Sequence, residues 1–273
     1  MPKLPQIKRS RRKDNPEARM SIGDHLRELR QRLFVSAAGV MVMTVVGYLV
    51  YERAFALITR PIEQANAKGA HLTLNFDTIL ASFDMKLEVS IWLGILFSSP
   101  LWIYEFWAFV GPGMTRKEKA YTWAYGTAGL FLFLAGAALG IWVMPRAVAI
   151  LTGFIPNGPT AGVIGANLYL SFIMRMVLAF GIAFLLPEVL VALNMLGLMQ
   201  GKTMLKGWRW AIVGIVTFMA IVNPMPDPWS MIFMSVPIAG LYFLACFISI
   251  RHDKRVERKR AQLDAELEAA LEE

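Results

Sequence analysis

Long apolar blocks separated by short polar connections constrain the fold of this 273-residue chain more than any other feature. Most blocks have about 20 residues, the length that an α-helix needs to cross roughly 30 Å of hydrocarbon. Hydrophobic residues make up 56% of the chain, above the roughly 45–50% of ordinary soluble domains. We therefore expect an all-α integral membrane protein with six transmembrane helices, at about 33–51, 87–110, 121–144, 168–196, 208–222 and 230–250.

Prolines, charges and small residues inside these blocks distinguish the spans. The second block contains Pro100 and Glu105, the third ends at Pro145, the fourth contains Arg175, Pro187 and Glu188, and the sixth contains Pro237. Proline removes a backbone donor, so we expect kinks at residues 100, 187 and 237. The pair Gly136 and Gly140 predicts close packing of the third helix against a neighbour. The fifth block, of about 15 residues, spans only roughly 22 Å as a helix.

Lysine and arginine are distributed unequally over the connections, with 22 on one side of the predicted membrane and 4 on the other. The positive-inside bias therefore places both termini in the cytoplasm. We divide the chain into a basic cytoplasmic arm at 1–22, a six-span membrane domain at 23–250 and a charged cytoplasmic tail at 251–273. The net charge of +8 is explained by topology and anionic lipid, so no nucleic-acid binding is expected.

Residue types exclude several function classes. The single Cys246 rules out an intrachain disulfide, and the three histidines lie outside the predicted spans. The segment from Gly197 to Gly201 has three residues between its glycines, whereas a phosphate-binding loop needs four. We therefore expect no enzyme, no metal and no cofactor, although a Ser–Lys intramembrane protease stays an open alternative.

Two carboxylates lie inside predicted spans, Glu105 and Glu188, both in the cytoplasmic half of the membrane. A charge at bilayer depth costs at least about 2.5 kcal/mol, so such residues usually face a cavity or a partner. A structural hydrogen bond between spans is one interpretation. The alternative is a small proton-coupled secondary transporter that uses Glu105 or Glu188.

Several segments carry a family resemblance when they are taken together and in order. They are His25-Leu-Arg-Glu28-Leu-Arg30-Gln-Arg-Leu33, an outer-loop proline at Pro61, Ser99-Pro100-Leu-Trp-Ile-Tyr-Glu-Phe-Trp107-Ala-Phe109-Val-Gly-Pro112 with Glu118 beyond it, Ala179-Phe-Gly-Ile-Ala-Phe184-Leu-Leu-Pro187, and Pro224-Met-Pro226-Asp227. From Gly23 to Ile250 the chain resembles the TatC family of the twin-arginine protein translocase.

The resemblance implies a function and a set of site residues. It implies a concave signal-peptide receptor in the bacterial cytoplasmic (inner) membrane that exports folded proteins with the proton motive force. The implied partners are the single-span proteins TatA and TatB, other copies of the chain and twin-arginine signal peptides. The implied signal-peptide site is Glu28 and Glu118, shaped by Arg30, Leu33 and Phe109, while Pro61, Pro100 and Asp227 are loop or structural residues.

The chemistry of the implied site agrees with its residue types. A leader marked by two arginines needs carboxylates, because a carboxylate can accept both arms of a planar guanidinium. Glu28 and Arg32 also stand at i and i+4, so simple charge pairing on a solvated helix face is the alternative. The chain departs from the family at Leu185, where many members have a glutamate, and at Glu105, where glutamine is commoner.

Overall fold

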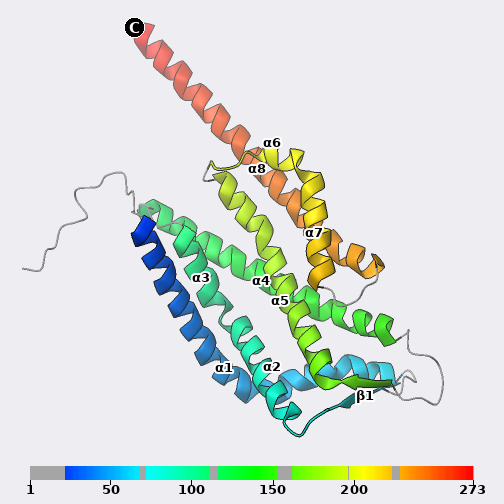
Figure 1. The fold of residues 1–273 in the computed structure, drawn as a ribbon. Helices are drawn as coiled ribbons and strands as arrows, with labels where there is room; N and C mark the ends of the chain where they lie inside the picture. The colour runs from blue at the N-terminus through cyan, green and yellow to red at the C-terminus, as the bar shows by residue number, and fades with distance from the viewer. Residues whose placement is uncertain are drawn as a thin grey trace, which may run out of the picture.

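The computed structural model describes residues 22–67, 72–110, 116–152, 162–195, 197–222 and 228–272. The elements, in order, are α1 (Ile22–Ala67), β1 (Leu72–Asn75), α2 (Ala81–Phe97), α3 (Ser99–Val110), α4 (Arg116–Thr152), β2 (Gly162–Gly165), α5 (Ala166–Met195), α6 (Gly201–Lys206), α7 (Trp208–Val222) and α8 (Pro228–Glu272). Helices thus make up nearly all of the described chain, and α5 runs through the middle of the bundle (Figure 1).

Helix α1 is much longer than the span predicted at 33–51. Figure 1 shows it bending, so that its light-blue second part passes behind the first turns of α5. Pro61, expected in an outer connection, is a buried residue inside α1. Burial of Ile58 and Ile62 against the core outweighs the roughly 3 kcal/mol that an internal proline costs a helix.

The predicted second span is broken into α2 and α3. The two helices meet at Ser98 and are bent by 53° relative to each other. Pro100 is the second residue of α3, where its missing N–H would have no helical partner in any case. The kink expected at Pro100 is therefore present.

Helices α4 and α5 pack closely along their length. A Cβ on Gly136 would collide with the backbone carbonyl of Phe180, and a Cβ on Gly140 would lie 3.0 Å from Cα of Val177. The close packing predicted for these two glycines is confirmed. Helix α4 continues through Pro145 to Thr152, whereas the candidate membrane span within it, Trp123–Arg146, ends close to the predicted end at Pro145. Val148, beyond the proline, is buried in the core, and this burial favours the continued helix.

A small sheet that the sequence did not predict lies at the end of the bundle opposite α6. Strands β1 and β2 pair in parallel, with Leu72 opposite Gly162 and Asn75 opposite Gly165. The side chain of Asn66 ties the end of α1 to the start of β1, since its Nδ2 donates to the carbonyl of Leu72 at 2.9 Å and its Oδ1 accepts from the same residue's N–H at 2.7 Å. The first residue of β1 is thereby held beside the end of α1.

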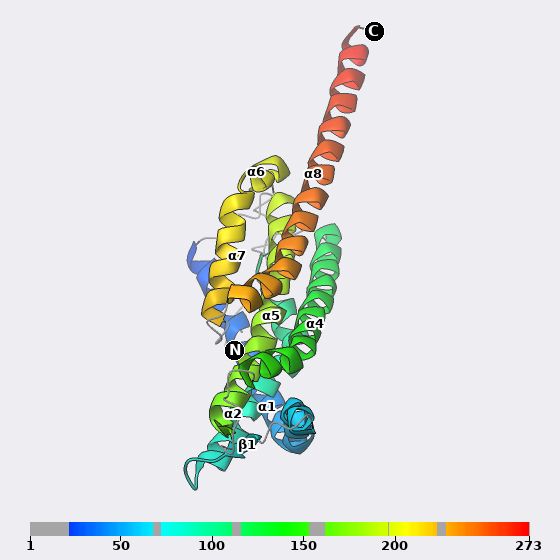
Figure 2. The ribbon, with the colours of Figure 1, turned by 90° about the vertical axis from the view of Figure 1, so that its right-hand side faces the viewer.

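The last two helices differ in length. Helix α7 has the same bounds, 208–222, as the predicted fifth span. Helix α8 extends from Pro228 through the predicted sixth span to Glu272, and its exposed second half projects beyond the other helices (Figure 2). Asp253 of α8 ties this helix to the first residue of α6 and to the end of α5, accepting from the Gly201 N–H at 2.7 Å and from Asn194 Nδ2 at 2.8 Å. The Gly201 amide is therefore engaged by a carboxylate.

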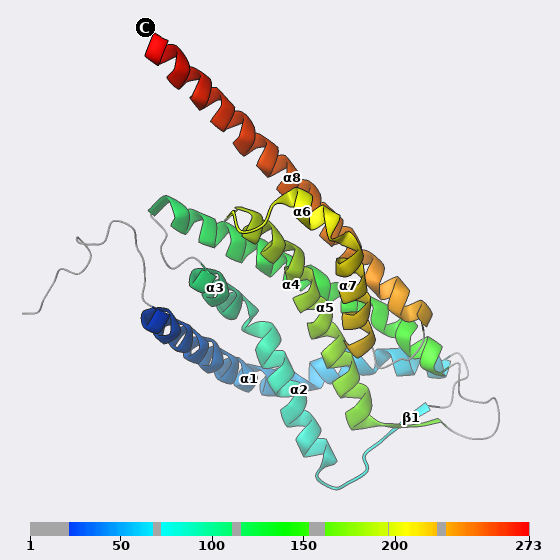
Figure 3. The ribbon, with the colours of Figure 1, turned by 45° about the horizontal axis from the view of Figure 1, so that its top comes forward.

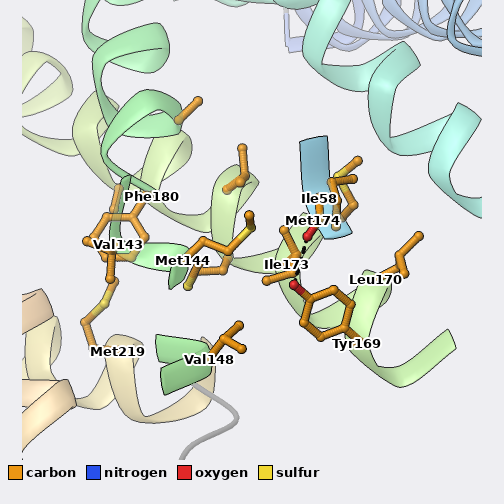
Figure 4. Close-up of a cluster of buried hydrophobic side chains, with 14 of the residues drawn as sticks. Ile58, Val143, Met144, Val148, Tyr169, Leu170, Ile173, Met174, Phe180 and Met219 are labelled. Carbon is orange, nitrogen blue, oxygen red and sulfur yellow. Dashed lines mark hydrogen bonds between the residues drawn. The ribbon is translucent and has the colours of Figure 1, made fainter. Parts of the chain in front are cut away.

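A continuous apolar core joins α1, α4, α5 and α7. In Figure 4 the side chains of Met144 and Ile173 point toward each other, and the hydroxyl of Tyr169 donates to the Ile58 carbonyl at 2.8 Å. Large apolar side chains also cover the outside, such as Leu49 at 76% and Trp210 at 82% exposure. Exposed apolar surface of this extent indicates a membrane or partner surface.

Four described helices, α1, α4, α5 and α8, are long and apolar enough to cross a membrane. The bent pair of α2 and α3 would be a fifth candidate, and α7 is a shorter apolar helix.

Candidate functional site

Three helix ends meet on the side of the bundle where the described chain begins. They are the start of α1, the end of α3 and the start of α4, which Figures 1 and 3 show gathered around one edge. We call the residues His25, Glu28, Arg32, Glu105 and Phe109 the α1–α3 rim.

Arg32 lies at the centre of the rim, between two carboxylates. Its Nε and Nη2 donate to Oε1 of Glu28 at 3.0 and 2.6 Å. Its Nη1 donates to Oε2 of Glu105 at 2.7 Å. The two carboxylates and the guanidinium are all partly buried, with side-chain exposures of 21%, 15% and 25%. Charge-assisted bonds in such a partly shielded place are stronger than bonds on an open surface.

Helix geometry explains how the chain assembles this cluster. Glu28 and Arg32 lie one turn apart on α1, so their side chains meet on one face. Glu105 lies on α3, which reaches α1 because of the bend at Ser98. The i and i+4 pairing foreseen from the sequence is therefore confirmed, whereas the contact between Arg32 and Glu105 was not foreseen. Only their similar distance from the same predicted membrane surface could have indicated it.

Aromatic stacking closes the rim. The rings of His25 and Phe109 stack with centroids 4.4 Å apart and planes 17° apart. This contact joins the first turns of α1 to the last turn of α3. Arg30 and Leu33 are instead exposed on α1, and Leu33 is 66% exposed.

Two predicted site residues cannot be placed in the cluster. Glu118 belongs to the first turn of α4, whose backbone borders the rim, but its side chain lies outside the described residues. Asp227 also lies outside them. The structure thus brings together Glu28 and Phe109 of the predicted set, and adds His25, Arg32 and Glu105.

Two adjoining grooves hollow one face of the bundle. The first, of about 460 Å³, is almost wholly apolar and lies next to the rim, with Val40, Trp102, Phe106, Leu185 and Val189 among its lining residues. The second, of about 670 Å³, lies between α2, α5 and α7 and is lined by residues that include Trp92, Arg175 and Phe218. Ile182 lines both. An acidic rim therefore adjoins an apolar groove.

Glu188 lies away from the rim, inside the packing of α3, α4 and α5. It is only 6% exposed, and neither carboxylate oxygen has a well-formed hydrogen bond to another described residue. Its Oε2 faces Gly129, close to Ile103 and Trp107. Leu185, one turn earlier on α5, lines the apolar groove instead. Glu188 and Leu185 therefore have different surroundings.

Metal binding finds no support in the described part of the chain, where no group of three or more His, Cys, Asp or Glu side chains could hold an ion.

Known proteins resemble this chain over most of its length. A family profile described as Sec-independent protein translocase protein (TatC) matches residues 24–237. The chain is 42% identical over 244 residues to the Sec-independent protein translocase protein TatC of Xylanimonas cellulosilytica, covering 89% of this chain and 88% of that protein. It is 37% identical over 254 residues to the protein of that name from Rothia mucilaginosa, covering 92% and 86%.

A solved structure agrees with these relatives. The crystal structure of the twin-arginine translocase receptor TatC in DDM superimposes with a TM-score of 0.72 at 26% identity, covering 82% of this chain and 99% of that chain. The similarity therefore includes the helices that build the rim and the grooves.

Proposed function

Because the chain belongs to the TatC family of Sec-independent protein translocases, we propose that its α1–α3 rim captures the paired arginines of twin-arginine signal peptides. The chain is a multi-pass membrane protein and a translocase component, and its family is not an enzyme family. The transporter alternative built on Glu105 or Glu188 has no support from these relatives.

One observation carries the proposal: the Glu28 carboxylate already binds a guanidinium, that of Arg32, through two hydrogen bonds. The rim therefore has the charge and the geometry that an arginine of a leader requires. Glu118, at the start of α4, supplies the second carboxylate in this proposal. The adjoining apolar groove suits the hydrophobic part of a leader, and Arg30, Leu33 and Phe109 shape the approach.

The proposal extends to topology and partners. The six spans are α1, the pair α2 and α3, α4, α5, α7 and α8, with both termini in the cytoplasm of a bacterium and residues 1–22 and 251–273 outside the membrane domain. TatA and TatB join this subunit and further copies of it, and the proton motive force drives export. Pro61, Pro100 and Asp227 shape the bundle and its outer turn.

Charge reversal tests the receptor proposal. The double variant Glu28→Arg, Glu118→Arg should lose crosslinking to a twin-arginine signal peptide while still inserting into the membrane. A matched control, Glu63→Arg with Glu266→Arg, makes the same charge change at exposed positions far from the rim and should crosslink normally. Normal crosslinking by the rim variant would remove both glutamates from the site.

Cysteine labelling tests the topology. Cys246 is the single cysteine of the chain, so a Cys246→Ser background has no native thiol that the reagent could label. A membrane-impermeant thiol reagent added outside intact cells should label Glu63→Cys but not Glu266→Cys. Labelling of both positions, or of Glu266→Cys alone, would contradict cytoplasmic termini with six spans.

A further inference from the structure

We propose that Arg32 is an internal competitor for the leader: its guanidinium occupies Glu28 until a leader arginine displaces it, and Glu105 retains Arg32 during the exchange. This inference rests on the proposed receptor function. It assigns roles to Arg32 and Glu105, neither of which belongs to the signal-peptide site expected from the sequence.

The contacts show why binding requires displacement. Both hydrogen bonds from Arg32 to Glu28 end on Oε1, which leaves that oxygen occupied. Oε2 of Glu28 is buried and has no hydrogen-bond partner among the described residues. A leader guanidinium that takes both oxygens in a bidentate pair must therefore move Arg32 aside.

The charge of the cluster favours a second cation. Glu28 and Glu105 together carry two negative charges, and Arg32 supplies one positive charge. The other arginines near the start of α1, Arg27 and Arg30, are exposed. A leader guanidinium would complete two ion pairs, one with Glu28 and one between Arg32 and Glu105. Among the described side chains, the cluster thus pairs two carboxylates with the one guanidinium of Arg32.

Glu105 makes the exchange easier because it already accepts a hydrogen bond from Arg32 through a different nitrogen, Nη1. When Nε and Nη2 leave Glu28, Arg32 therefore keeps a charged partner. A neutral glutamine at 105 would hold Arg32 more weakly, since bonds between two ionised groups are the stronger kind. Arg32 would then compete more strongly for Glu28.

A ranking of Arg32 variants separates competition from a structural role. The measurement is the Kd of a fluorescent twin-arginine signal peptide for the purified full-length chain. Competition predicts that Arg32→Gln binds tightest, Arg32→Lys next and the native chain weakest. The gain expected for Arg32→Gln is about fivefold, the equivalent of about 1 kcal/mol for a partly exposed ion pair. If Arg32 only holds Glu28 in place, the order is reversed, and that result would overturn the proposal.

A matched control removes the general effect of charge. Arg27→Gln deletes the same charge five residues away at an exposed position. Its effect on the Kd should be smaller and should vanish at high salt, whereas the gain of Arg32→Gln should persist because partly buried pairs are less screened. Equal gains in affinity for the two variants at every salt concentration would show that Arg32 acts only through its charge, and this result would contradict the proposal.

The role of Glu105 is tested by coupling. The gain from Arg32→Gln should be larger in a Glu105→Gln background than in the native one, because Arg32 then lacks its second partner. An equal or smaller gain would show that Glu105 does not receive Arg32. A melting curve for each variant confirms that it is folded, and Arg32→Lys serves if Arg32→Gln is not.

Glu28→Gln distinguishes the two levels of the proposal. Unimpaired binding by this variant would refute the proposed receptor site itself. Loss of binding by Glu28→Gln together with weaker binding by Arg32→Gln would leave the receptor site in place and refute only the competition.

Discussion

Glu105 and Glu188 are both carboxylates inside apolar helices, yet the bundle treats them in opposite ways. Glu105 lies at the rim of α3, partly open to water, and bonds Arg32 of another helix. Glu188 lies deep between α3, α4 and α5, and neither of its oxygens has a well-formed hydrogen bond to another described residue. The comparison shows that depth and partner, not residue type, decide what a carboxylate in a membrane helix contributes.

Removing the two carboxylates should change the stability of the fold in opposite directions. A partnered carboxylate at a rim adds charge-assisted hydrogen bonds, so removing it leaves Arg32 half paired. A buried carboxylate that lacks well-formed hydrogen bonds recovers little of its desolvation cost, so removing it relieves the fold. Four measurements test this contrast.

The largest effect is expected from arginine at the buried position. Glu188→Arg should prevent recovery of folded protein, because an always-charged guanidinium without a partner costs about 3 kcal/mol or more in a membrane interior. Glu105→Arg, at the rim, should still fold, since its head can reach water. Size-exclusion profiles in detergent measure both. Equal recovery of folded protein for the two variants would contradict the difference between the two positions.

Replacing each carboxylate by methionine, an apolar side chain of similar length, should change the free energy of unfolding in opposite directions. Glu188→Met should raise the free energy of unfolding by about 1–3 kcal/mol, because an unsatisfied buried polar group disappears. Glu105→Met should lower it by a similar amount by leaving Arg32 with one partner. Denaturant or thermal unfolding in detergent gives both values. The same sign for both variants would contradict the assignment.

A steric effect of about 1 kcal/mol is expected at Gly129. A Cβ there would lie 2.5 Å from Oε2 of Glu188 and 3.2 Å from atoms of Ile103 and Trp107. Gly129→Ala should therefore destabilise the native chain, and Glu188→Ala should relieve part of that loss in the double variant. Fully additive losses would show that Glu188 does not press against Gly129.

The smallest effect is expected from salt. Raising ionic strength from about 0.05 M to about 0.5 M should narrow the stability difference between the native chain and Glu105→Gln by a few tenths of a kcal/mol, because the rim cluster is partly screened. The stability difference between the native chain and Glu188→Gln should not change with salt. Melting temperatures across a salt series provide the check.

Much of the fold could be predicted because hydrocarbon imposes a length on each span. Helix α7 has the predicted bounds and α5 differs by a residue or two at each end. The helices extend beyond the predicted spans where packing overrides a local signal. Pro61 and Pro145 both lie inside helices, because the residues that follow them are buried against other helices. The strands β1 and β2 are far apart in the sequence, so no local sequence pattern predicts their pairing.

The candidate site was predictable only in part. Glu28, Arg30, Leu33 and Phe109 were expected from the family resemblance, and the pairing of Glu28 with Arg32 follows from helical spacing. For Glu105 the sequence left open a structural hydrogen bond between spans, but it did not indicate the partner. Its contact with Arg32 depends on the 53° bend between α2 and α3, which sets where α3 ends relative to α1.

By itself, the sequence determined the membrane class, the helical spans and the charges available at each helix end, because these depend on local hydrophobicity and on the 3.6-residue turn. Only the tertiary structure decided that Arg32 bridges two carboxylates while Glu188 has no such partner. The reason is that a pairing between helices depends on their relative depth, tilt and rotation, and these emerge only when the whole bundle packs.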